Sequence, residues 1–245
     1  MSATSTSRVS SPIRRERGRL GHVVSGLAVA LGCVLFLGGF GWAAVSYRPY
    51  TVPTDSMVPT VHPGDKILAQ KVSASDVHRG DVVVFKDKLW GDLPMVKRVV
   101  GVGGDTVECC DKQGRMTVDG KPVTEPYLKG GGPASISSYK TTVPKGKLFL
   151  LGDNRAISDD SRIHLGDAEQ GAVPATDVRG RVEATAWPLG RFGTVARTSA
   201  FDALPDGGAS AQGPLRWLAA MIVAGAALIL GGAAYGPLAK RFGRG

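Results

Sequence analysis

Two long apolar stretches without Asp, Glu, Lys or Arg lie near the two ends of the chain. They cover residues 22–45 and 217–239. Each is long enough to cross the roughly 30 Å hydrocarbon core of a bilayer as a helix. The sequence therefore predicts transmembrane helices over residues 22–46 and 216–238.

Each stretch has an alternative interpretation. The first could be a cleavable signal peptide, because "WAAVS" at residues 42–46 offers small residues, but its apolar run exceeds the ~7–15 residues typical of such a segment. The second is rich in Gly and Ala, so it could instead pack at the membrane interface or on the first helix. Length favours two membrane anchors.

Between the spans, short apolar or alternating runs are separated by Gly, Pro, Asp and Asn. This pattern is typical of short strands, and "TVDGKPV" predicts a hairpin with Asp119-Gly120 as a two-residue turn. We expect a mainly β domain of antiparallel sheets over residues 47–197, with a flexible loop at 129–139. Residues 198–215 are expected to form a linker back to the membrane.

The net charge of +9 suggests a nucleic-acid-binding protein until its distribution is considered. Residues 46–213 hold 21 basic and 20 acidic residues, so most of the excess lies in the tails, residues 1–21 and 239–245. Positively charged segments beside transmembrane helices stay on the cytoplasmic side. Because both tails are positive, we expect two cytoplasmic termini and an extracytoplasmic domain. A nucleic-acid partner would need a basic face on that domain, and its charge balance argues against one.

Cysteines and histidines give no metal-binding signal. Cys33 lies in the first span, and Cys109 and Cys110 are adjacent, so no Cys-x-x-Cys spacing exists. A disulfide between the adjacent pair is possible outside the cytoplasm. We expect no metal and no cofactor.

Ser56, in "VPTDSMVPT", is a candidate nucleophile beside the membrane, although an ordinary turn serine would look the same. A serine nucleophile needs a base, and no histidine occupies a supporting motif. A lysine can serve when burial lowers its pKa. In a strand over "PMVKRVVGV", Lys97 shares a face with Met95 and Val99, whereas Lys66 and Lys71 look solvated or paired. A lysine at a sheet edge remains the alternative for Lys97.

Three other motifs allow competing interpretations. "LGDNRAISDDSR", residues 151–162, could be a calcium loop, a solvated turn or a hydrogen-bonded platform for a catalytic group, but it lacks EF-hand spacing. "SSYK", residues 137–140, matches the Ser-x-x-Lys of penicillin-binding enzymes without its companion motifs. "GVGGDT", residues 101–106, is a glycine pattern with no helix after it.

Together these motifs resemble the bacterial type I signal peptidases, which remove signal peptides from exported proteins. "VPTDSMVPTVHPGDKILAQKV" resembles the family's nucleophile box, "RGDVVVF" its next strand, "VKRVVGVGGDTVE" its lysine box and "GDNRAISDDSR" its last box. "VDGKPVTEPYL" resembles a family hairpin. The four boxes follow the family's order, and the resemblance extends from the first span to about Pro188.

The resemblance implies a role for each matching residue. Ser56 is the expected nucleophile, Lys97 the general base, and Thr54 the hydroxyl that joins the Ser56 N–H in the oxyanion hole. Ser158 is expected to hydrogen-bond the base. Asp160 and Arg162 are expected to support the site. The expected pockets for small substrate residues are lined by Val52, Pro53, Met57, Met95 and Val96.

The implied activity is cleavage of preproteins after Ala-x-Ala-type motifs through an acyl-enzyme, with preproteins and the lipid bilayer as partners. Three features depart from the family pattern or have no assigned role. They are Asp55, the pair Cys109-Cys110 and the second span. One alternative is a non-catalytic membrane-tethered β-domain that binds exported chains. Another is a self-cleaving Ser/Lys protease of the repressor type, but those carry a DNA-binding domain and none is visible here.

Overall fold

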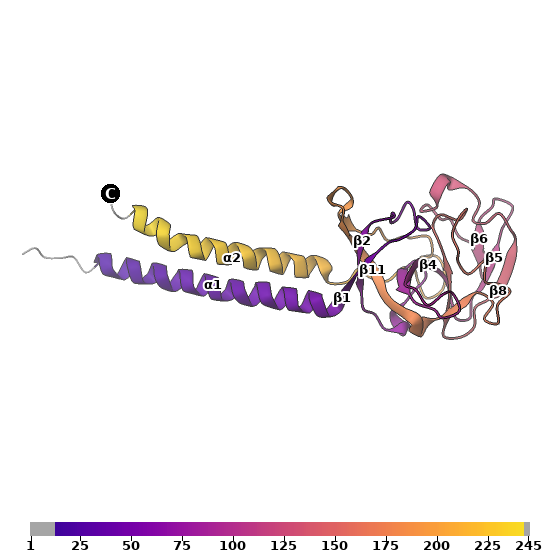
Figure 1. The fold of residues 1–245 in the computed structure, drawn as a ribbon, viewed down its shortest axis with the longest axis horizontal. Helices are drawn as coiled ribbons and strands as arrows, with labels where there is room; N and C mark the ends of the chain where they lie inside the picture. Colours follow the sequence, from indigo (N-terminus) through magenta and orange to yellow (C-terminus); the bar gives the residue numbers. More distant parts are fainter. Residues whose placement is uncertain (1–12, 243–245) are drawn as a thin grey trace, which may run out of the picture. The chain divides into compact units, whose positions relative to one another are not determined.

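The computed structural model describes residues 13–242, which fall into two units. One unit contains the helices α1 (Ile13–Ser46) and α2 (Leu215–Phe242); the other is a β-rich domain over Val45–Gly213 (Figure 1). The predicted basic tails lie partly outside the described residues, at 1–12 and 243–245. The expected fold class, a mainly antiparallel β domain with an apolar helix on either side in the chain, is confirmed.

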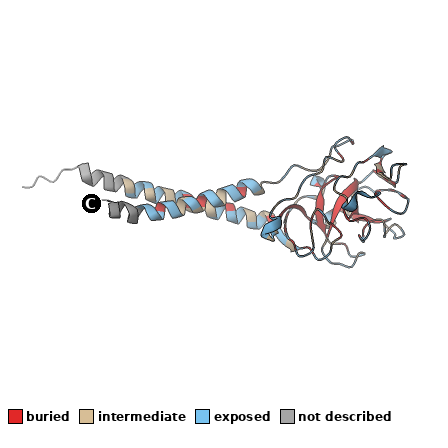
Figure 2. Ribbon diagram, turned by 90° about the horizontal axis from the view of Figure 1, so that it is seen from above, coloured by how far each residue is buried: buried red, intermediate tan, exposed pale blue. Residues whose placement is uncertain are grey.

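The two helices run antiparallel and pack against each other through glycines. Gly32 faces Gly225, and a Cβ atom on Gly225 would lie only 2.6 Å from the backbone nitrogen of Phe36. Ser25 Oγ also donates a hydrogen bond to the Gly232 carbonyl at 2.7 Å. Most other side chains described on the helices are exposed or half-buried (Figure 2). Both helices contain a segment long and apolar enough to cross a membrane.

The larger sheet has eight antiparallel strands, in the order β1-β2-β11-β3-β4-β9-β10, with β12 paired to β11. Their bounds are β1 Tyr47–Thr51, β2 Lys66–Gln70, β3 Val82–Phe85, β4 Met95–Val102, β9 Lys147–Leu151, β10 Ala172–Pro174, β11 Val178–Trp187 and β12 Gly193–Thr194. β3 and β4 lie inside this sheet. All four residues of β3, "VVVF", are buried, and so are all residues of β4 except its two ends, Met95 and Val102. The buried part of β4 includes the charged residues Lys97 and Arg98.

The smaller sheet has the order β7-β6-β5-β8. Its strands are β5 Thr106–Cys109, β6 Met116–Val118, β7 Lys121–Pro122 and β8 Tyr139–Thr142. The predicted hairpin is confirmed: Val118 pairs with Lys121, and Asp119 and Gly120 both have positive φ angles, as a type I′ turn requires. Cys109 and Cys110 form a disulfide.

Three buried apolar clusters stabilise the β domain. Val82 and Val84 face a cluster that includes Met57, while Val83 and Phe85 face a second cluster on the opposite side of β3. A third cluster joins residues of β4 and β9 to the smaller sheet. The loop that carries Ser56 is therefore anchored in the core next to the central strands.

Two segments differ from the flexible structure that their composition predicts. In the expected loop 129–139, Ala134 and Ser135 are buried and Tyr139 begins β8. The expected linker is also packed, because Phe201 is fully buried among the residues of the third cluster. Ala and Gly are the commonest residues of this second segment, and a few larger apolar anchors are enough to order it. Four short 3₁₀ turns complete the fold, at Ala74–Asp76, Lys129–Gly131, Ala175–Asp177 and Leu189–Arg191.

Candidate active site

Ser56 lies on the loop between β1 and β2, and neighbouring residues fix its position. Met57 is fully buried, and its carbonyl accepts hydrogen bonds from the amides of Thr60 and Val61. The ends of the loop are joined by a bond from the Val52 amide to the Asp65 carbonyl. Ser56 itself is 7% exposed. The loop therefore presents a fixed serine at the edge of the core.

Lys97 lies on β4 and is 4% exposed. Val99, two residues along on the same face, is fully buried, and Met95 packs against the same cluster. This burial lowers the pKa of Lys97 below its usual value, and the negative charges of Asp160 and Asp159 offset part of the effect. The apolar face that the alternation predicts is present, and it favours a neutral amine.

The fold brings these two residues together across 41 positions of sequence. Lys97 Nζ lies 3.0 Å from Ser56 Oγ. Thr54 Oγ1 lies 3.2 Å from the same oxygen. No histidine hydrogen-bonds Ser56 among residues 13–242. A serine, a hydroxyl neighbour and a desolvated lysine are the components of a Ser/Lys nucleophile.

The segment after β9 forms the platform behind this pair. Asp160 is fully buried; it accepts a hydrogen bond from the Gly152 amide at 3.1 Å and is bound by the Arg162 guanidinium at 2.8 and 2.9 Å. The negative charges of Asp160 and Asp159 in this segment raise the pKa of Lys97. Of the three interpretations of this segment, the hydrogen-bonded platform matches the structure, and the described residues contain no acidic cluster suited to a metal ion.

Ser158 lies in the same platform, but its hydroxyl makes no hydrogen bond within the described part of the chain, although the residue is buried. The bond to the base that the resemblance implies is thus not formed here. A Cβ atom on Gly152 would collide with the Ser158 side chain and come within 2.6 Å of the Ser56 carbonyl oxygen. The platform and the Ser56 loop are in contact at this glycine.

Asn154 also holds the Ser56 loop, and sequence reasoning missed this role. Its amide N–H donates to the Ser56 carbonyl at 3.0 Å, and its side-chain Nδ2 donates to the Asp55 carbonyl at 3.1 Å. In the sequence, the signal that could have indicated this role is the place of Asn154 in "GDN", within the segment that forms the platform.

A buried ion pair next to the site was likewise missed. Arg98 binds Asp153 at 2.6 and 2.9 Å, and its guanidinium lies 3.9 Å from the centre of the Tyr127 ring. Thr60 donates a hydrogen bond to the same carboxylate. This cluster ties β4 to both the platform and the Ser56 loop.

A cleft of about 320 Å³ opens at Ser56 and Lys97. The structure brings all five of the expected pocket residues to its wall: Val52, Pro53, Met57, Met95 and Val96. Ile157, Asp159 and the half-buried Asp55 also line it. Ser158, Asp160 and Arg162 do not line the cleft and belong to the platform behind it.

One backbone edge of β4 is open beside this cleft. Met95, Val96 and Lys97 pair with β3 on one side. On the other side, pairing with β9 begins only at Arg98, opposite Leu151. An open strand edge can accept an added peptide strand, so the cleft suits an extended peptide.

Comparison with known proteins decides the family. A family model described as "Signal peptidase, peptidase S26" matches residues 22–187, more than half of the chain. The chain belongs to the signal peptidase family. It is therefore a serine endopeptidase, and with its two apolar helices it is a membrane protein. The non-catalytic tethered domain and the repressor-type protease are set aside.

Individual signal peptidases are similar over most of their length. "Probable signal peptidase I" of Mycobacterium leprae is 34% identical over 206 residues, covering 60% of this chain and 71% of that protein. Signal peptidase IB of Staphylococcus aureus is 32% identical over 184 residues, covering 68% and 88%. A solved signal peptidase I from Enterococcus faecalis has 28% identity and a TM-score of 0.34, covering 42% of this chain and 93% of that one.

Proposed function

We propose that this signal peptidase removes signal peptides from exported preproteins with Ser56 as nucleophile and Lys97 as general base. The observation that carries the proposal is the 3.0 Å distance between Lys97 Nζ and Ser56 Oγ, at a lysine whose pKa is lowered by burial. An amine that is neutral near physiological pH can accept the proton of a serine hydroxyl. Without that proton transfer the serine is a weak nucleophile.

The reaction follows from this arrangement. Lys97 takes the proton of Ser56 as Oγ attacks the scissile carbonyl, and the negative oxygen is stabilised by Thr54 Oγ1 and the Ser56 N–H. That N–H makes no hydrogen bond within residues 13–242, so it is available to the substrate. Lys97 then protonates the leaving amine, and a water molecule activated by the same lysine hydrolyses the acyl-enzyme. Loss of one oxyanion donor typically lowers the rate about 100–1,000-fold.

The cleft supports selection of small residues. A substrate bound along the open edge of β4 as an extended strand directs alternate side chains to one side. Two of them would face the mainly apolar wall of the cleft, to which Val52, Met57 and Val96 contribute. This supports a preference for Ala-x-Ala-type motifs before the cleaved bond.

A preprotein in the bilayer suits the position of this site in the chain. Ser56 follows the end of α1 by ten residues, so it lies within roughly 35 Å of the membrane end of that helix. The charge distribution supports cytoplasmic termini and an extracytoplasmic domain. With a protease added outside intact cells, we expect cleavage within the β domain and protection of epitope tags at both termini. Loss of either tag would overturn this orientation.

The test of the proposed function uses the purified full chain in detergent micelles with a preprotein bearing an Ala-x-Ala site. Mass spectrometry should find one cut directly after that motif. Ser56→Ala and Lys97→Ala should each abolish the cut while the circular dichroism spectrum stays unchanged. Lys121→Ala, at an exposed position on β7, is the matched control and should cleave normally. Cleavage by a folded Lys97→Ala variant would overturn the proposed base.

A further inference from the structure

The segment over residues 198–213, here called the C-terminal strap, lies beyond the part of the chain that the family model matches. It precedes α2 and is fixed to the β domain along its length. Phe201 is fully buried and Leu204 is 7% exposed. Arg79 Nη1 donates a hydrogen bond to the Pro205 carbonyl at 2.8 Å. The strap is therefore an ordered part of the domain.

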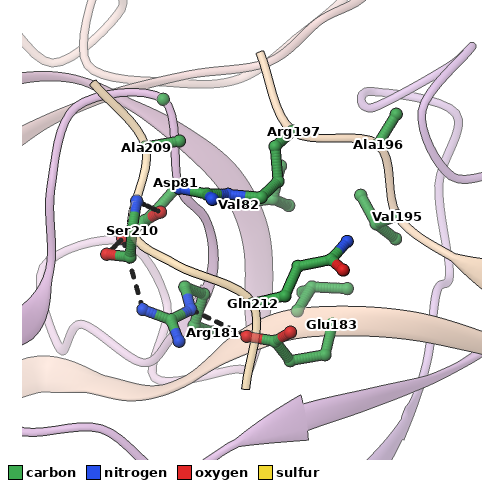
Figure 3. A pocket seen from close by; sticks show the side chains of 12 residues that line it. Asp81, Val82, Arg181, Glu183, Val195, Ala196, Arg197, Ala209, Ser210 and Gln212 are labelled. Atoms are coloured by element: carbon green, nitrogen blue, oxygen red, sulfur yellow. Dashed lines mark hydrogen bonds and ion pairs between the residues drawn. The ribbon is translucent and has the colours of Figure 1, made fainter. Parts of the chain in front are cut away.

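The end of the strap is held by a buried carboxylate, shown in Figure 3. The Ser210 amide donates to Asp81 Oδ1 at 2.9 Å, and Ser210 Oγ donates to Asp81 Oδ2 at 2.6 Å. Asp81 is 4% exposed. The small cavity beside them, about 20 Å³, has room for roughly one water molecule. Hydrogen bonds to a buried carboxylate are among the stronger ones in proteins, so this attachment is specific.

A second attachment joins the strap to β11. The Gly213 amide donates to Glu183 Oε2 at 3.0 Å, and Arg181 Nη2 donates to the Ala211 carbonyl at 3.2 Å. Arg181 and Glu183 also bond each other at 2.9 Å (Figure 3). The strap thus contacts β11 and the start of β3 together.

The residues under the strap also carry the hydrogen bonds of β4 next to Lys97. The Val99 amide donates to the Asp81 carbonyl at 2.9 Å, and the Gly80 amide donates to the Val99 carbonyl at 2.7 Å. Arg98 Nη1 donates to the Gly80 carbonyl at 2.8 Å. The side chain of Asp81 holds the strap while its backbone holds β4.

The strap also lies directly on Gly80. A Cβ atom there would meet the side chains of Thr198, Ala209 and Phe201 at 3.0–3.2 Å. The tight fit leaves Gly80 little freedom to shift while the strap is in place. The contacts therefore run without a gap from Ser210 through Asp81 and Gly80 to the two residues that follow Lys97 on β4.

We propose that Ser210, acting through Asp81, is a positioning residue that holds β4 so that Lys97 Nζ stays beside Ser56 Oγ. This inference rests on the proposed Ser/Lys mechanism. Ser210 does not touch the cleft residues, so its loss should affect the geometry of the proton transfer more than peptide binding. Small displacements of reacting groups have large effects on rate.

The experiment measures kcat and KM for a soluble fluorogenic Ala-x-Ala peptide with the full chain in micelles. Ser210→Ala and Asp81→Asn should lower kcat about tenfold and leave KM within about twofold, since a displaced base slows chemistry without closing the cleft. Ser210→Thr, which keeps the hydroxyl, should restore the wild-type kcat. Ser199→Ala is the matched control, because Ser199 is exposed on the same strap and its side chain makes no hydrogen bond within residues 13–242.

The outcomes separate this inference from the proposed function. If the wild type cleaves and Ser210→Ala keeps the wild-type kcat, the positioning role is overturned while the mechanism stands. The positioning role is also overturned, and the mechanism stands, if the only effect of Ser210→Ala is to make the strap more sensitive to limited proteolysis. If Ser210→Thr is as slow as Ser210→Ala, the hydroxyl contact is not the cause. An inactive wild type overturns the proposed function and this inference together.

Discussion

At the residue scale, the site depends on a lysine placed where its charge is unfavourable. Lys97 sits on a face whose neighbours are apolar, and this burial lowers its pKa. Sequence alternation made Lys97 the best candidate base among the basic residues and the prolines drew attention to Ser56, but the sequence assigned their roles only through the family resemblance. The roles of Asn154 and Arg98 could not be predicted, because their partners are far away in sequence and only the fold brings them close.

The burial of Lys97 has a consequence for stability. Its folded-state pKa lies below the unfolded value of about 10.4. Between these two pKa values the unfolded chain binds a proton that the folded chain does not, so the free energy of unfolding rises with pH. Replacing the lysine with an apolar side chain of similar length removes the cost of burying the cation.

Lys97→Met should therefore be inactive but more stable than the wild type near neutral pH. We expect the Tm to rise by about 2–4 °C, which corresponds to roughly 1 kcal/mol for a domain of this size. The difference should shrink as the pH approaches 10. Thermal unfolding followed by circular dichroism in micelles measures it. A variant that is less stable than the wild type across the whole pH range would contradict the burial argument.

Gly152 offers a second test at this scale. Gly152→Ala places a Cβ atom against the Ser158 side chain and the Ser56 carbonyl oxygen, so the Ser56 loop and the platform must separate. We expect kcat/KM for the peptide to fall about 100-fold. Gly166→Ala, in the exposed turns after the platform with open space around it, is the control. Normal activity of Gly152→Ala would show that this contact does not set the geometry.

At the scale of elements, the sequence predicted the patterned segments and the short hairpin of β6 and β7, but it missed other short strands. β4 lies within "PMVKRVVGV", where a strand was predicted. The three-residue β10 and the two-residue β12 are too short to carry a periodic signal. β8 was hidden because it follows a segment rich in Gly and Ser, and its pairing with β5 supplies the order that its own residues do not.

The packing of α1 on α2 is also an element-scale feature that hydropathy does not predict. Small residues let helices approach closely in a membrane, and Gly32 and Gly225 fill that role here. Gly225→Leu should separate the helices, whereas Gly231→Leu, where nothing lies within 4 Å, should not.

Spin labels can measure this separation. Labels at the exposed positions Val23 and Leu230, in a background with Cys33 replaced by serine, should give a single narrow distance distribution in the parent chain. We expect Gly225→Leu to broaden or lengthen it and Gly231→Leu to preserve it. An unchanged distribution in Gly225→Leu would mean that these glycines do not set the helix contact.

At the scale of the whole molecule, composition and charge distribution predicted two apolar helices, a β domain between them and a membrane protein. They did not predict that residues 198–213 pack on that domain. The composition is that of a linker, and its order depends on Phe201 and on buried carboxylates contributed by β11 and the start of β3. Such partners are visible only once the sheet is folded.

The most direct test of the Ser/Lys account is the pH dependence of kcat/KM for the wild type and for Asp159→Asn. The acid limb of this profile reports the pKa of the free enzyme's base. The account predicts that activity rises as one group loses its proton, with a pKa below the ordinary lysine range. Because the charge of Asp159 raises the pKa of Lys97, the limb should move to lower pH in Asp159→Asn. A limb that stays in place or moves to higher pH would contradict Lys97 as the base.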